Sequence, residues 1–252
     1  HTVMHALYSS NPSEPDEKRL KPLAEVGKTR LQALIKDTDG LGAQVRMRIL
    51  QKLGNAPEVT GRNLVYEDII CRYARRILES DLSLLEKKGL PSFKILGLEE
   101  FRETQIGGFR FIGYIDRLDC FDPGTVRIVD YKTGKVEDNE MEITDDNAES
   151  VLAALFGNSN KDRPGIALQF YIYDRFMEGK TGGRTILNSI YQTQRLFTEE
   201  VHTVPVSKVF VEGVESRLTG KLDELRNPEA AWKRTGDDKT CSYCKFKIIC
   251  GR

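Results

Sequence analysis

The chain has 252 residues, enough for one large domain or two small ones. Apolar residues make up 39% and charged residues 30%, and no stretch approaches the roughly 18 consecutive apolar residues of a membrane-spanning helix. Disordered, fibrous and membrane-spanning classes are therefore excluded. Lys and Arg together number 38, as do Asp and Glu, so a nucleic-acid-binding face would have to come from local clustering of charge.

Cysteine usage indicates a reducing environment. The count of five is odd, and the first ten residues lack the basic and apolar segments of a secretory leader. We therefore expect a cytoplasmic protein without a disulfide framework. The cysteines are Cys71, Cys120, Cys241, Cys244 and Cys250.

The first third of the chain reads as helical. Amphipathic helices are predicted over 21–35 and 41–53, with a polar loop at 9–19 and another at 55–63. The strongest helix covers 66–88, where apolar residues recur at helical spacing until Gly89-Leu90-Pro91 ends it. Its other face carries three arginines, which we interpret as solvated, with a phosphate-binding track as the alternative: Arg72, Arg75 and Arg76.

From residue 93 the pattern changes to strands. An antiparallel meander is predicted from three segments rich in aromatic and branched residues, namely 93–103, 109–119 and 125–133. A charged loop follows at 136–150. The remaining elements are a helix, two strands and a helix, at 165–177, 184–194, 196–205 and 207–226. This order describes an α/β fold with a mixed central sheet flanked by helices.

We expect a single domain over residues 1–252. Within it, a helical region covers about 20–90, a core about 93–226, and a cysteine-rich tail about 235–252.

Asp130 and Lys132 form the most informative pair in the sequence. They are two residues apart on a predicted strand, so their side chains share one face. Both are costly to bury without a purpose, and they follow the apolar Ile128 and Val129. The pair therefore marks a candidate site. The alternative is a surface salt-bridge cluster on a hairpin without a catalytic role.

Asp116 on the preceding strand joins this pair only in one register. If Asp122–Thr125 forms a simple turn, the numbers of any two residues that face each other across the strands add up to 247. Asp116 and Asp130 then lie on opposite faces of the sheet. One bulged residue shifts the sum to 246, so that Asp116 faces Asp130 and Tyr114 faces Lys132. A shared site therefore predicts a bulge between the turn and the two acids.

Two directly opposed carboxylates repel each other and call for a cation between them. Oxygen ligands suit Mg²⁺ or Mn²⁺. Lys132 could then orient an attacking water or stabilise charge that develops on a phosphate.

Three segments, in this order, resemble the RecB-type branch of the PD-(D/E)xK nuclease superfamily. They are Gly113-Tyr-Ile-Asp-Arg-Leu-Asp119, Val129-Asp-Tyr-Lys-Thr-Gly134 and Gln169-x-x-x-Tyr173. The resemblance is closest to the nuclease domain of AddB-type helicase–nucleases and covers residues 5–250. It implies a PD-(D/E)xK nuclease-like core with an N-terminal helical insertion.

The resemblance also implies roles for single residues. Asp116 and Asp130 match metal-binding acids, the backbone carbonyl of Tyr131 matches a further metal ligand, and Lys132 matches the catalytic lysine. Gln169 and Tyr173 share one helix face and match a pair that positions the lysine and the DNA strand, whereas by themselves they would read as a half-buried core face.

His5 matches the histidine of the Gly-x-x-x-His segment that opens the family's core and supplies a metal ligand. His1 stands where the family has glycine, and we expect the sequence to begin at a cut in a longer protein. A lone histidine is more often structural, so both readings of His5 stay open. Glu99 or Glu100 resembles another family acid, and the sequence leaves open which one faces the site.

The tail spacing Cys241-x2-Cys244-x5-Cys250 is typical of a metal or cluster site. The resemblance implies a [4Fe–4S] cluster in the full-length protein, with a fourth cysteine upstream of the Gly-x-x-x-His segment. We therefore expect the cluster to be absent or incomplete in this chain. Cys71 is a possible fourth ligand, although its helical neighbours Ile70 and Tyr73 place it in the core.

The function predicted from these observations is a Mg²⁺- or Mn²⁺-dependent deoxyribonuclease, an exonuclease by resemblance. Its partners would be single-stranded DNA or duplex ends and a helicase domain or subunit acting in DNA break repair. The first alternative is a non-catalytic DNA-end-binding module of the same fold. The second is a zinc-stapled scaffold without a role in nucleic-acid binding.

Overall fold

A computed structural model describes residues 1–9, 22–157, 163–198, 201, 203–231, 241–242 and 244–251. The chain divides into two compact units. The first consists of His1–Glu103, Ile112–Val136 and Tyr173–Pro205. The second consists of Thr104–Phe111, Glu137–Ile172 and Val206–Arg252.

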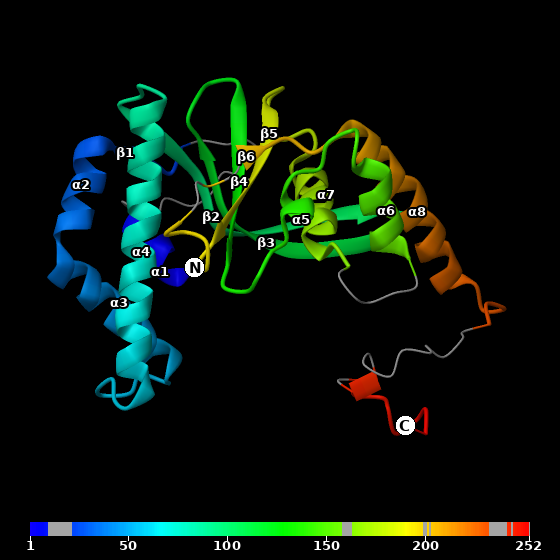
Figure 1. The fold of residues 1–252 in the computed structure, drawn as a ribbon, viewed down its shortest axis with the longest axis horizontal. Helices are drawn as coiled ribbons and strands as arrows, with labels where there is room; N and C mark the ends of the chain where they lie inside the picture. The colour runs from blue at the N-terminus through cyan, green and yellow to red at the C-terminus, as the bar shows by residue number, and fades with distance from the viewer. Residues whose placement is uncertain are drawn as a thin grey trace. The chain divides into compact units, whose positions relative to one another are not determined.

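The strands pair into a mixed sheet (Figure 1). Its order is β1-β2-β3-β4-β5-β6 among the described residues. The pairs β1–β2, β3–β4 and β5–β6 are antiparallel, whereas β4–β5 is parallel and needs a crossover, which contains α7 (Gly165–Met177). The predicted α/β class with a mixed sheet is confirmed. The strands are β1 (Ala24–Gly27), β2 (Ser92–Ile106), β3 (Phe109–Cys120), β4 (Thr125–Lys132), β5 (Thr185–Gln192) and β6 (Thr203–Val204).

Local hydrogen bonds explain where two helices of the first unit begin or end. The side chain of Asp37 accepts a hydrogen bond from the Gly40 N–H at 2.9 Å and so caps the start of α3. Gly89, at φ 65°, ends α4 by letting the Leu90 N–H reach a carbonyl one turn back. These helices are α1 (Thr2–Tyr8), α2 (Lys28–Lys36), α3 (Thr38–Lys52) and α4 (Arg62–Lys87).

Several sequence predictions of single elements are wrong. The stretch predicted as a helix over 21–35 begins with β1, because Ala24 and Val26 are buried on one face and pair with β2. Only β6 is a strand in the described part of 196–205. The segment 136–150, predicted as a loop, contains α5 (Asp138–Met141) and the start of α6 (Ala148–Phe156). Helix α1 was not predicted.

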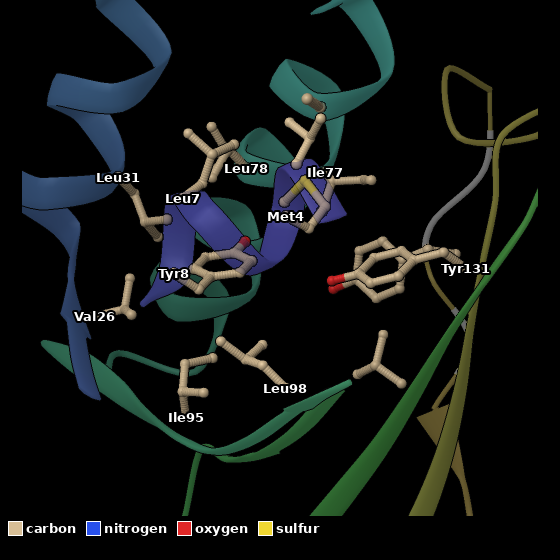
Figure 2. Packing of buried hydrophobic residues seen from close by; sticks show 14 of the residues in the cluster. Met4, Leu7, Tyr8, Val26, Leu31, Ile77, Leu78, Ile95, Leu98 and Tyr131 are labelled. Carbon is tan, nitrogen blue, oxygen red and sulfur yellow. The ribbon is translucent and has the colours of Figure 1, made fainter. Parts of the chain in front are cut away.

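The main apolar core of the first unit forms around α1. Figure 2 shows Tyr8 of α1 among side chains from α2, β2 and α4, including Leu31, Ile95 and Leu78, all fully buried. Burying such a side chain contributes about 1.5–3 kcal/mol relative to leaving it exposed. This core holds α1 in place, together with the residue that precedes it, His1.

The second unit contains α5, α6 and α8 (Lys208–Arg226). A Cβ added at Gly213 of α8 would lie 2.3 Å from Leu152 Cδ1 of α6, so the glycine permits close helix packing. The guanidinium of Arg226 lies 4.3 Å from the centre of the Phe109 ring. No helix in the described parts of the chain is long and apolar enough to cross a membrane.

Candidate active site

Strands β3 and β4 pair in the register that a shared site requires. Arg117 pairs with Val129 and Asp119 with Arg127, so paired numbers sum to 246. At the turn the Thr125 N–H donates to the Asp122 carbonyl, a pair whose numbers sum to 247. One extra residue therefore lies between the turn and the ladder, which confirms the predicted bulge. Continued by one step, the register places Asp116 opposite Asp130.

The carboxylate of Asp116 has a partner on each oxygen. Its Oδ2 accepts the backbone N–H of Tyr131 at 2.9 Å. Its Oδ1 lies 2.7 Å from Nδ1 of His1, the residue that precedes α1. The Asp116 side chain is 12% exposed, so the acid is held in place but remains within reach of solvent.

Asp130 is more deeply buried and is contacted by two of the predicted site residues. Its Oδ2 lies 2.7 Å from the Lys132 amine, and the Tyr173 hydroxyl donates to its Oδ1 at 2.8 Å. The Lys132 side chain is 27% exposed, whereas that of Asp130 is 5% exposed. The lysine amine therefore stands between a buried acid and open solvent.

A third acid, Glu99, influences the charge of the His1 imidazole. The hydrogen bond to Asp116 is the largest cause that raises the pKa of His1, and burial of the imidazole opposes it. The charges of Asp116, Asp130 and Glu99 raise this pKa further. Glu99 has φ 50°, an unusual conformation for a residue other than glycine. Glu100 instead pairs with Arg102. Of the two acids left open by the sequence, Glu99 is the one whose charge acts on His1.

Three further residues predicted for the site, His5, Tyr131 and Gln169, lie in α1, β4 and α7. His5 is half-buried in α1, one turn after His1, and among the described contacts it is His1 that meets Asp116. The Tyr131 ring is buried, which raises the pKa of its phenol to about 12. Gln169 lies one turn before Tyr173 in α7 and belongs to the second unit. The roles of His5, the Tyr131 carbonyl and Gln169 stay predictions.

The donor set fits a hard divalent cation. The carboxylate of Asp116 lies 2.7 Å from the His1 imidazole and is 12% exposed, and carboxylate oxygens are the ligands that Mg²⁺ prefers; the charges of Asp116, Asp130 and Glu99 also raise the pKa of His1. The described residues contain no group of three or more His, Cys, Asp or Glu side chains already arranged as a metal cage. Mg²⁺ does not need one, because it is usually held by one or two carboxylates with waters and substrate phosphates completing its shell.

A buried network of charges fixes the strands behind the site. Arg117, between Asp116 and Leu118, donates to Asp81 of α4 and to Asp119, at 2.7 and 2.6 Å. Arg127 of β4 donates to Asp119 at 2.8 Å. Burial by itself would raise the pKa of Asp81, but the ion pair with Arg117 lowers this pKa to about 2. The network ties β3, β4 and α4 together.

Sequence reasoning missed the roles of His1, Asp81 and this network. Arg117 and Asp119 lie within the Gly-x-x-Asp-Arg-x-Asp segment, so their place in the motif was the one available signal. Asp81 carried a weaker signal, a single acid near the apolar side of a long helix, where Ile77, Leu78 and Leu85 are buried with it.

The cysteines are free thiols. Cys241, Cys244 and Cys250 belong to the second unit, whereas Cys71 lies in α4 of the first. Burial is the largest cause that raises the pKa of the Cys71 thiol. The role of the tail cysteines as cluster ligands stays a prediction.

Comparison with family models identifies the superfamily of this chain. The model of the PD-(D/E)XK nuclease superfamily matches residues 1–251. No curated protein matches the chain. The matched region includes both opposed acids, the adjacent lysine and the mixed sheet that carries them. The chain therefore belongs to the PD-(D/E)XK nuclease superfamily.

Proposed function

We propose that this site hydrolyses phosphodiester bonds of DNA with the help of Mg²⁺ or Mn²⁺. Membership of the superfamily implies nuclease activity. The observation that carries the proposal is the hydrogen bond from the backbone N–H of Tyr131 to Asp116 at 2.9 Å, which holds the acid of β3 beside Asp130 and Lys132, with the Lys132 amine 2.7 Å from Asp130. A fold kept only for binding has no need of this arrangement, because opposed carboxylates repel each other and the DNA backbone.

Each residue of the site has a distinct role in the proposed reaction. Asp116 and Asp130 would hold the metal, with the Tyr131 carbonyl and a histidine, His1 or His5, as further candidates. When bound, the metal would lower the pKa of a water and polarise the phosphate. The Lys132 amine would orient the attacking water and stabilise negative charge that develops on the phosphate oxygens. Tyr173 keeps the Asp130 carboxylate in place through its 2.8 Å hydrogen bond.

We also propose a narrower placement. The ordered set of segments supports a RecB-type nuclease, close to the AddB-type, with the whole chain as one nuclease domain. By that resemblance it would be an exonuclease linked to a helicase and acting in DNA break repair in the cytoplasm. The tail spacing Cys241-x2-Cys244-x5-Cys250 supports a [4Fe–4S] cluster in the full-length protein.

The second candidate is a non-catalytic DNA-end-binding module of the same fold. What favours it is the tail, which supplies three of the four thiolates that such a cluster normally takes. By the resemblance, the cluster shapes the path of the DNA, so hydrolysis without an intact cluster would be weak.

Labelled oligonucleotides test both candidates. We expect the protein to degrade linear single-stranded DNA when Mn²⁺ or Mg²⁺ is present and to stop when EDTA is added. Asp130→Asn should lower the rate by at least about 10³-fold, on the scale of losing a main electrostatic group. Asp146→Asn, which changes an exposed acid of the second unit, is the matched control and should cleave normally.

The outcomes separate the candidates. A circular single strand should survive if the enzyme is an exonuclease, and its cleavage would show an endonuclease. Tight binding of DNA ends without any metal-dependent cleavage would establish the binding module. Normal cleavage by a folded Asp130→Asn protein would end the assignment of the reaction to this site.

A further inference from the structure

A cleft of 460 Å³ lies in the first unit between α1, α3 and α4. It reaches the candidate active site, because His1 and Tyr131 line it, and these two residues also contact Asp116. Its volume falls within the range of about 300–1,000 Å³ typical of small-ligand sites. The cleft therefore borders the two residues that contact Asp116.

The walls of the cleft suit a flat aromatic ligand. Ile49, Ile70 and Ile77 supply apolar surface. Tyr73 and Tyr66 also line it, and Tyr66 is 53% exposed although it is a large ring. An exposed tyrosine beside an apolar slot is a surface on which a nucleobase can stack.

The charge of the cleft suits a polyanion. Arg48 and Lys52 of α3 line it, and none of the described lining residues is acidic. Arg48 donates from Nη1 to Gln51 at 3.0 Å. Its Nε–H is buried and has no hydrogen-bond acceptor among the described residues. A phosphate in the cleft would neutralise the guanidinium of Arg48 and the amine of Lys52.

We propose that the cleft binds unpaired nucleotides of the DNA strand that the active site cuts. The bases would stack on Tyr66 and Tyr73, and the backbone would follow Arg48 and Lys52 toward His1 and Asp116. A base can enter a slot of this kind only when it is not paired, because pairing keeps its faces within the stack. The cleft would thus make the enzyme prefer single-stranded DNA. This inference rests on the proposed function and assigns its substrate-binding surface.

Binding is measured separately from cleavage by working in the Asp130→Asn protein. The probe is a short single-stranded DNA that carries 2-aminopurine, with the fully paired duplex as comparison. We expect 2-aminopurine fluorescence to fall on binding, as stacking quenches it, and the single strand to bind more tightly than the duplex. Adding Tyr66→Ala should weaken single-strand binding about tenfold and restore the fluorescence, whereas Tyr66→Phe should behave as the parent.

The charge contribution has its own readout. Lys52→Ala should flatten the dependence of log affinity on log salt by about 0.7, the value for one phosphate contact to a single strand. Lys36→Ala removes an exposed lysine of the same unit away from the cleft and should leave the slope unchanged. Thermal unfolding checks that every variant is folded.

Two results would overturn the inference. The first is single-strand binding that is unaffected by Tyr66→Ala and Lys52→Ala. The second is equal or tighter binding of the duplex without any fluorescence change. In either case cleavage by the parent protein, lost on Asp130→Asn, would leave the proposed function standing. Conversely, a cleft that binds DNA in a protein that cleaves none would uphold the inference and refute the function.

Discussion

The carboxylate of Asp116 accepts a hydrogen bond from the backbone N–H of Tyr131, at 2.9 Å. The bond ties the acid of β3 to the residue that stands between Asp130 and Lys132 on β4. The described backbone pairs between these strands end with Arg117 and Val129, so the side chain of Asp116 extends the contact beyond them. The second acid and the lysine are therefore held in register with the first by a bond that the site itself supplies.

Removing the lysine amine should affect the chemical step more than binding. Lys132→Met keeps the length of the side chain but removes the charge that lies 2.7 Å from Asp130. We expect kcat on single-stranded DNA to fall by about 10²–10³, and the affinity measured without metal to change little. Lys94→Met, at an exposed position of β2, is the control and should retain full activity. Equal loss of kcat and affinity in Lys132→Met would show that the lysine acts in binding instead.

The buried charges behind the site should matter for stability. Arg127 is 3% exposed, and Arg127→Met leaves Asp119 and Asp81 without one of their cations. Breaking a buried ionic group in this way typically costs about 3–5 kcal/mol of unfolding free energy. Denaturant unfolding measures it. The control, Arg46→Met, removes an exposed partner of Glu67 and should change stability little. A similarly small effect of Arg127→Met would mean that the network contributes little.

Asp174 should make stability depend on pH. Burial raises the pKa of this carboxyl from 3.8 to about 6, and the hydrogen bond from Asn188 only partly offsets it. Between these two values the native state holds a proton that the unfolded chain has released, so stability should fall as pH rises from about 4 to 6. Asp174→Asn should therefore stabilise the protein by about 1–2 kcal/mol at pH near 8, since partial solvent contact reduces the full effect of about 1.4 kcal/mol per pKa unit.

The check for Asp174 is a series of unfolding curves in metal-free buffer. The advantage of Asp174→Asn should vanish at pH near 4, where Asp174 is protonated in much of the population and resembles asparagine in charge. A constant difference between the two proteins across the whole range would contradict the raised pKa as its cause.

The cysteine tail should bind iron incompletely. A [4Fe–4S] cluster normally takes four thiolates, and the tail of the 252-residue chain supplies three, namely Cys241, Cys244 and Cys250. We expect iron and sulfide analysis of anaerobically purified protein to give well under four of each per chain, with weak visible absorbance. Cys71→Ser should change neither. A full complement that Cys71→Ser removes would identify Cys71 as the fourth ligand and overturn this expectation.

The sequence by itself determined the features that depend on near neighbours along the chain. Helical spacing of apolar residues and Gly89 located the body and end of α4. The alternation of residues along β4 puts Asp130 and Lys132 on one face, and the requirement that Asp116 join them predicts the bulge that the strand register shows. These inferences succeed because strand period and turn chemistry are local properties of the backbone.

Only the tertiary structure decided which distant residues complete the site. His1 meets Asp116 across more than a hundred residues of sequence, and Asp81 reaches Arg117 from a separate helix. Neither residue has a spacing that marks it, because each contact depends on how α1 and α4 pack against the sheet. Glu99, whose charge acts on His1, has an unusual backbone angle, φ 50°, that strand alternation cannot foresee. The local pattern fixes the strands, whereas long-range packing of the helices selects the partners of their side chains.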